Sequence, residues 1–135
     1  MILINKFFCV NYWITSFVFK NKSYPLFSTI LVLTLYEFFA LLFIFDFVAF
    51  QILGQRGMII NRNMLIGFII MTIILLYNYF YFTLKGRYLN ILIDFKKDDN
   101  KNRIYSFVFS ITLMLIIIIL NIYSVYSIRN NIIWF

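Results

Sequence analysis

The sequence predicts an all-α protein, a membrane helical bundle with three transmembrane helices preceded by an amphipathic interfacial helix. The first observation is composition: 64% of the 135 residues are hydrophobic and 13% are charged, against about 45–50% and about 25% in soluble domains. The second is that the apolar residues gather in three long stretches separated by polar links. A soluble fold of this size buries only about two-thirds of its surface, so the remaining apolar surface is expected to face lipid.

The first 22 residues predict a helix that lies in the plane of the membrane surface. Their apolar side chains recur at alternating spacings of four and three, which places them on one helix face. The apolar face holds Leu3, Phe7, Val10, Ile14 and Phe17, and the other side holds Asn5, Lys6, Ser16 and Lys20. The alternative is a short first membrane span. Lys6 and Lys20 enclose only thirteen residues, too few for a hydrocarbon core of about 30 Å.

The three transmembrane helices are predicted over residues 26–53, 64–84 and 104–128 of a single membrane domain, 1–135. Pro25 suits the first turn of the first helix. A helix over 26–53 would be about 42 Å long, so it either tilts or ends near Asp46. Tyrosines near the end of the second helix form an aromatic belt of the kind found at membrane interfaces.

Basic residues predict the orientation of the chain. With three spans, nine Lys and Arg residues fall on the side of the amino terminus and of loop 85–103, and three fall on the other side. The amino terminus and this loop are therefore expected in the cytoplasm, and the carboxyl terminus outside. Within the loop, Leu84, Tyr88, Ile91 and Phe95 keep helical spacing, so the second helix is expected to continue as an amphipathic extension.

The layout of about two-thirds of the chain resembles a loose group of small three-helix bacterial inner-membrane proteins. The resemblance rests on Tyr77-Asn-Tyr-Phe-Tyr-Phe82, on Lys85-Gly-Arg-Tyr88, and on the charged break and apolar span that follow. It implies a bacterial cytoplasmic membrane, and in some cases a place among accessory proteins of competition or defence loci. The group has no established activity, so the resemblance assigns no functional residue.

Glu37 is the most informative polar residue, because it is expected near the centre of the first transmembrane helix. A carboxylate at that depth costs about 2.5–3.5 kcal/mol on insertion scales. The other two helices place Thr72 and Thr112 at matching depth, and neither is basic. Glu37 is therefore protonated and hydrogen-bonded, or faces a water-filled path, or meets a cation on a partner.

Three further polar groups are candidates for interactions within the membrane or at its surface. Asp46 is expected near the outer face and is predicted to form interfacial ion pairs with Arg56, Arg62 or Arg129. It points away from Glu37, about 13 Å along the axis, so the two carboxyls cannot act as a paired acid and base. The third helix carries a polar stripe, read as a packing face or alternatively a pore lining: Ser106, Ser110, Asn121 and Ser124. Asn78 is expected to pair with Ser110.

These observations favour a protein that is not an enzyme, without catalytic residues, metal or cofactor. The chain has no His and a single Cys, Cys9, which excludes the usual zinc sites and His-based acid–base catalysis. Its +7 charge is assigned to orientation and not to nucleic acid. The expected partners are the lipid bilayer and either further copies of the chain or another membrane protein. We expect an accessory or immunity-type subunit; the alternatives are a small oligomeric channel or membrane-disrupting defence effector using Glu37, or a supernumerary respiratory-complex subunit.

Overall fold

The computed structural model describes residues 3–18, 25–52 and 64–132, and this part of the chain is helical without strands. The helices are α1 (Leu3–Val18), α2 (Pro25–Phe47), which continues as π-helical turn η1 (Val48–Ile52), α3 (Met64–Thr83), 3₁₀ turn η2 (Leu84–Gly86), α4 (Arg87–Lys97) and α5 (Asn100–Asn130). Three helical segments are long and apolar enough to cross a membrane: Pro25–Ile52, Leu65–Lys97 and Asn100–Asn130. The all-α class and the three long apolar helices are thereby confirmed.

The three long helices begin and end close to the predicted boundaries. Pro25 is the first residue of α2, where its missing N–H leaves no hydrogen bond unmade. The 31 residues of α5 give a length of about 46 Å, more than the apolar layer of a bilayer requires. Its extra turns hold the polar residues 100–103, which were predicted as loop. Phe47 is followed by the π-helical turn, so this helix does not end at Asp46.

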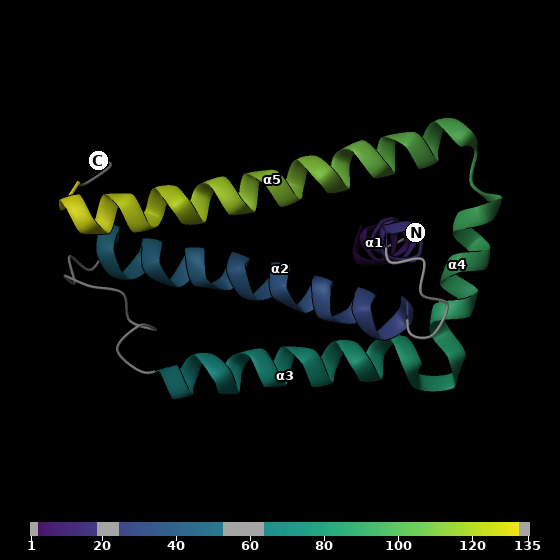
Figure 1. Cartoon of the computed structure of the whole chain (residues 1–135), viewed down its shortest axis with the longest axis horizontal. Coiled ribbons are helices and arrows are strands. Elements are labelled where there is room, and N and C mark those ends of the chain that lie inside the picture. Colours follow the sequence, from purple (N-terminus) through teal and green to yellow (C-terminus); the bar gives the residue numbers. More distant parts are fainter. Residues whose placement is uncertain (1–2, 19–24, 53–63, 133–135) are drawn as a thin grey trace.

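The long helices form an open row with α2 in the middle, as Figure 1 shows. α2 packs against α3 on one side and against α5 on the other, and among the described residues α3 and α5 barely meet. α2 and α5 run in the same direction, whereas α3 runs in the opposite one. α2 is therefore the only long helix with two long neighbours within the described chain.

A sharp elbow joins α3 to α4. Lys85 and Gly86 have φ angles of 56° and 64°, a left-handed conformation that reverses the course of a right-handed helix. α4 consequently runs across the ends of α3 and α5 (Figure 1). The predicted amphipathic extension of the second helix is present as α4, and the two left-handed residues set it at an angle to α3. The predicted face is confirmed within α4, where Ile91 is buried and Tyr88 and Phe95 pack on the same core, whereas Leu84 before the elbow is 60% exposed.

We expect Gly86→Ala to lower the free energy of unfolding by about 1–2 kcal/mol, the cost of a left-handed non-glycine residue. An added Cβ would meet only the Leu89 Cδ1 atom, at 3.9 Å, so the backbone angle and not a clash sets the cost. The measurement is helix loss in mixed micelles titrated with SDS. Lys85→Gly is the matched control, and it should not destabilise because it relieves the strain at φ 56°. Equal losses in both variants would contradict this account of the elbow.

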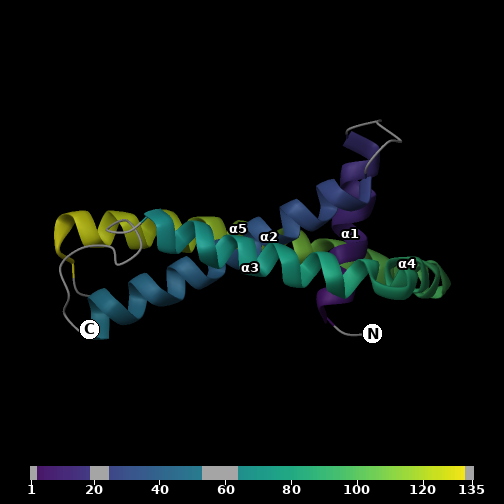
Figure 2. The same cartoon turned by 90° about the horizontal axis from the view of Figure 1, so that it is seen from below.

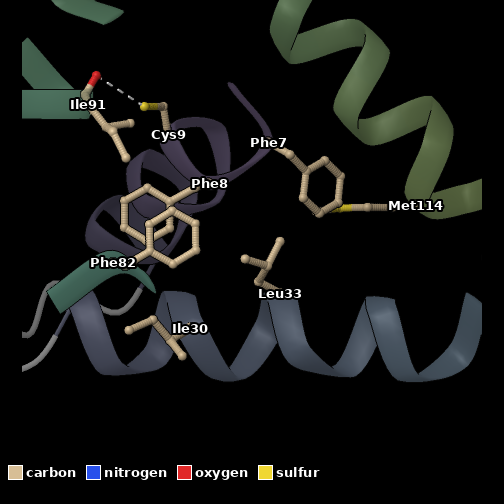
Figure 3. Close-up of a cluster of buried hydrophobic side chains, with 8 residues drawn as sticks. All are labelled: Phe7, Phe8, Cys9, Ile30, Leu33, Phe82, Ile91 and Met114. Carbon is tan, nitrogen blue, oxygen red and sulfur yellow. Dashed lines mark hydrogen bonds between the residues drawn. The ribbon is translucent and has the colours of Figure 1, made fainter. Parts of the chain in front are cut away.

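α1 crosses the row at the end that carries α4, which Figure 2 shows most clearly. It packs against α2, α4 and α5, and Phe8 also stacks on Phe82 of α3, with ring centroids 4.1 Å apart. Figure 3 shows the resulting core, in which α1 supplies three of the eight side chains: Phe7, Phe8 and Cys9, with Ile30, Leu33, Phe82, Ile91 and Met114. The structure thus shows a first helix over Leu3–Val18 and packs it against the row of long helices.

The predicted faces of α1 agree only in part with its burial. Phe7 and Val10 of the apolar face are buried and Ser16 of the polar side is exposed, but Phe17 of the apolar face is 71% exposed and Asn5 of the polar side is 9% exposed. The reason is that α1 has neighbours on several sides, so a single apolar face does not describe its burial. Its buried polar groups have partners: Thr15 shares a hydrogen bond of 2.8 Å with Thr29 of α2, and Asn5 accepts one from the Tyr81 hydroxyl at 3.3 Å. Residues 1–2 and 19–22 of the predicted interfacial helix lie outside the described residues.

Candidate functional site

The main polar cluster of the long helices lies where α3 meets α2. The side-chain nitrogen of Asn78 donates hydrogen bonds to the Glu37 Oε2 atom at 2.7 Å and to the Thr34 Oγ1 atom at 3.2 Å. Asn78 and Thr34 are fully buried, whereas Glu37 is only partly covered. We call these three residues the Glu37–Asn78–Thr34 cluster.

The spacing of Thr34 and Glu37 explains how one amide reaches both. Residues three apart on a helix share a face, so α2 presents the hydroxyl and the carboxyl together to α3. An apolar environment offers no hydrogen-bond partners, so polar side chains on apolar helices form hydrogen bonds with one another. The carbonyl oxygen of Asn78 is buried without a hydrogen-bond partner within the described chain, so the amide is committed to α2 through its nitrogen. The cluster is therefore suited to fixing α3 on α2, and it contains no pair of groups arranged for proton transfer.

Asn78 does not pair with Ser110, contrary to the prediction. The Ser110 hydroxyl instead donates to the Ser106 carbonyl at 2.8 Å, within its own helix. Equal depth in a membrane does not make two residues neighbours, since α2 lies between α3 and α5. Of the three alternatives for Glu37, this geometry favours the hydrogen-bonded carboxyl group, with an amide as its partner.

Asp46 does not form the predicted ion pair with Arg129. Asp46 is 7% exposed, and its Oδ1 atom has no hydrogen-bond partner within the described chain, whereas Arg129 is exposed. The Arg129 guanidinium lies at the surface of the last turn of α5, whereas the Asp46 carboxyl group is buried on the packed face of α2. The other two predicted partners, Arg56 and Arg62, lie outside the described residues.

The polar stripe of α5 is largely a packing face. Ser106, Ser110 and Ser124 are at most 6% exposed, and Ser127 extends the stripe with no exposure at all. The hydroxyls of Ser106 and Ser110 donate to carbonyls four residues earlier in α5, which satisfies them without water. Asn121 donates to the Phe39 carbonyl of α2 at 3.0 Å and so links the two helices. These contacts favour the packing interpretation over a pore lining.

Sequence reasoning missed the threonines. Thr34 joins the Glu37–Asn78–Thr34 cluster, and Thr29 meets Thr15 of α1. The spacing of Thr34 and Glu37 was visible in the sequence and could have indicated a shared face. The contact between Thr15 and Thr29 depends on how α1 crosses α2, which helical periodicity does not determine.

The lone cysteine offers a probe of α1. Cys9 is 1% exposed, and its thiol lies 3.7 Å from the Ile91 carbonyl of α4, towards which it donates (Figure 3). Burial, and secondly the negative charge of Asp98, raise the pKa of the Cys9 thiol to about 12. A buried thiol with a raised pKa is inert, because the thiolate is the reactive form.

We expect Cys9 to react with a soluble maleimide far more slowly than a free thiol at pH 7.5, and the rate to rise about tenfold per pH unit up to about pH 11. The raised pKa of Cys9 also means that the fold holds a proton which the unfolded chain releases above about pH 8.5. The contribution of this group to stability is therefore present below that pH and decreases as the pH rises towards 12. For the maleimide reaction, the control is labelling of Cys9 in the unfolded protein in SDS. Rapid labelling of the folded protein at neutral pH would contradict the burial of this thiol.

Fold and site together define an all-helical protein with three helices long and apolar enough to cross a membrane, linked by hydrogen bonds from the side chains of Asn78 and Asn121. Within the described chain no three His, Cys, Asp or Glu side chains lie close enough together to hold a metal ion. Comparison with protein-family models, with curated proteins and with solved structures found no match. The resemblance to small bacterial inner-membrane proteins therefore remains a prediction.

Proposed function

We propose that this chain is a small non-enzymatic membrane protein that binds another membrane protein, as an accessory or immunity-type subunit. The observation that carries the proposal is the open row of long helices. α3 and α5 each pack on α2 but barely on one another within the described chain. A single chain of this shape leaves long helix faces for lipid or for the helix of a partner.

The apolar character of these faces supports a partner helix. On α3, Leu65, Phe68 and Ile73 are 61–75% exposed, and on α5, Ile119 and Ile122 are 61% and 66% exposed. The polar side chains at the helix contacts are engaged within the chain: Asn78 with Glu37, and Asn121 with the backbone of α2. Helix association in lipid depends on close packing where such polar contacts are absent. The shape of the exposed faces of α3 and α5 is therefore expected to determine which partner helix binds.

A second candidate is an oligomeric channel or membrane-disrupting effector that uses Glu37. The observation that favours it is the incomplete burial of Glu37, which leaves part of its carboxyl group uncovered by the chain. The hydrogen-bonded serines of α5 and the contact with Asn78 favour the accessory subunit instead.

The test places a photo-crosslinking amino acid at Phe68 or Ile119, which are exposed, and at buried Leu33 as the matched control. The chain is produced at native level in its own membrane and irradiated. We expect a discrete adduct with a different polypeptide from the exposed positions and none from Leu33. The full chain overproduced alone should leave the membrane potential unchanged. Depolarisation on overproduction, or adducts only between copies of the chain, would overturn the accessory-subunit proposal.

For the position in the membrane, we infer that the end of the row bearing α1 and α4 lies at the cytoplasmic surface of a bacterial inner membrane. This end carries exposed Lys96 and Lys97 beside exposed Leu89 and Ile93, a combination suited to the interface. α1 adds Trp13, 57% exposed and stacked on Phe17. The proposal keeps the amphipathic interfacial role of both helices, with α1 held by the row beneath it.

The nine-to-three division of basic residues predicts the topology. A reporter that is active only after export should work when fused behind Phe135, and a reporter active only in the cytoplasm should be silent there. The reverse pattern is expected for fusions within the 85–103 loop, which serve as the control. Cytoplasmic activity behind Phe135 would show that the chain does not cross the membrane three times in this orientation.

A further inference from the structure

The elbow between α3 and α4 borders an open hollow of about 670 Å³ that none of the contacts above explains. Its wall on the α3 side is aromatic and apolar, and its wall on the α4 side is basic and polar. The residues that line it are Tyr77, Phe80, Tyr81, Leu84, Lys85, Arg87 and Asn90. The lining thus has two positive charges and no negative charge.

The two basic residues are brought together by the same backbone feature that makes the elbow. Lys85 and Gly86 are both left-handed, so the chain turns sharply between Lys85 and Arg87 and places both at the mouth of one hollow. The Arg87 guanidinium stacks over the Tyr81 ring, 4.0 Å from its centroid. This cation–π contact holds the charge at the rim, while the edge of the guanidinium keeps its N–H donors available for an oxyanion.

The aromatic wall belongs to the last turns of an apolar helix. Tyr77 and Phe80 are 61% and 54% exposed, and Leu84 is 60% exposed. Tyrosine at the end of such a helix is typical of the boundary between hydrocarbon and headgroups. A ligand in the hollow would therefore have apolar surface on one side and cations on the other.

We propose that this elbow is a binding site for an anionic phospholipid. Lys85 and Arg87 would hold the headgroup phosphate, and Tyr77, Phe80 and Leu84 would contact the glycerol and the start of the acyl chains. The volume falls within the range of small-molecule sites. A lipid matches the hollow better than free phosphate, because only a lipid contacts the apolar wall. An anionic headgroup matches better than a zwitterionic one, because the lining offers no negative charge for the positive group of a zwitterionic lipid. The site does not depend on the orientation of the chain or on the partner proposed above.

The test is native mass spectrometry of the full chain in micelles that contain equal amounts of phosphatidylglycerol and phosphatidylcholine. We expect phosphatidylglycerol to be retained preferentially. The double variant Lys85→Asn, Arg87→Gln should reduce its retention about tenfold, since each basic residue near an anionic surface contributes appreciably to binding. Asparagine is used at position 85 because it tolerates the left-handed backbone. The matched control, Lys96→Gln with Lys97→Gln, removes the same charge from the other end of α4 and should leave retention unchanged.

Three outcomes would overturn the proposal. Equal retention of both lipids would show that the lining does not select an anionic headgroup. An equal loss in the Lys96 and Lys97 variant would assign binding to general surface charge. Displacement of the lipid by millimolar inorganic phosphate would show an anion site without a lipid component. Circular dichroism of each variant must match that of the natural chain, and the single variant Arg87→Gln, which leaves the left-handed backbone untouched, should show a partial loss.

Discussion

Replacing Asn78 by leucine is expected to lower the free energy of unfolding by about 2 kcal/mol. The change removes two hydrogen bonds between α3 and α2, to Glu37 and to Thr34. Hydrogen bonds between membrane helices contribute about 0.6 kcal/mol on average and up to about 1.7, and leaving a buried polar partner unsatisfied adds to the loss. The measurement is unfolding in mixed micelles titrated with SDS, followed by circular dichroism.

Asn121→Leu is the matched control, because Asn121 also links two long helices but donates only to backbone carbonyls. Its loss should be about 0.6 kcal/mol. Glu37→Gln should preserve stability, since the glutamine oxygen can accept the same bond from Asn78. Glu37→Leu combined with Asn78→Leu should cost clearly less than the sum of the single changes, as for residues in contact. Strict additivity would show that the Glu37–Asn78–Thr34 cluster does not act as a unit.

The largest loss is expected from Phe8→Ala, at about 3 kcal/mol. Phe8 is fully buried, and its ring stacks on Phe82 with the planes 15° apart. Since Phe8 lies where α1 meets the row of long helices (Figure 3), the cavity would loosen α1 as a whole. Release of α1 would also expose Cys9, so maleimide labelling at pH 7.5 should accelerate at least tenfold. Unfolding in SDS and the labelling rate are measured on the same variant.

Phe17→Ala provides the control on the same helix. Phe17 is 71% exposed and contacts Trp13, so its loss should leave both the stability and the Cys9 labelling rate nearly unchanged. If Phe8→Ala and Phe17→Ala had equal effects, α1 would be held by its general hydrophobicity and not by the buried core. Faster labelling in Phe17→Ala alone would contradict the packing of α1 described here.

Several features of the fold were predictable from sequence because they depend on local chemistry. Three runs of apolar residues long enough to span the hydrocarbon core of a bilayer predict three long helices without any knowledge of their neighbours. Pro25 indicated the start of α2, and the spacing of Tyr88, Ile91 and Phe95 indicated the inner face of α4. Glu37 and Asn78 were singled out because polar side chains are costly in apolar helices, and both belong to one cluster.

The pairings and faces that sequence reasoning misjudged depend on which helices are neighbours. The pairing of Asn78 with Ser110 assumed that α3 touches α5, whereas α2 lies between them. The faces of α1 were assigned as if it met one surface, whereas Phe8 meets α3 and Cys9 meets α4. The ion pair of Asp46 with Arg129 was predicted because both were expected at the same side of the membrane. The side chain of Asp46 is buried, however, and that of Arg129 is exposed.

The sequence by itself therefore determined that the chain is helical, with three helices apolar enough for a membrane, and which polar residues are costly there. Only the tertiary structure decided that α2 is central, that α1 crosses the row and that the elbow brings Lys85 and Arg87 together. The physical reason is that hydrophobicity acts on each segment independently of its neighbours. Helix association in lipid depends instead on close packing and on a few hydrogen bonds, and these exist only between particular surfaces once the helices have met.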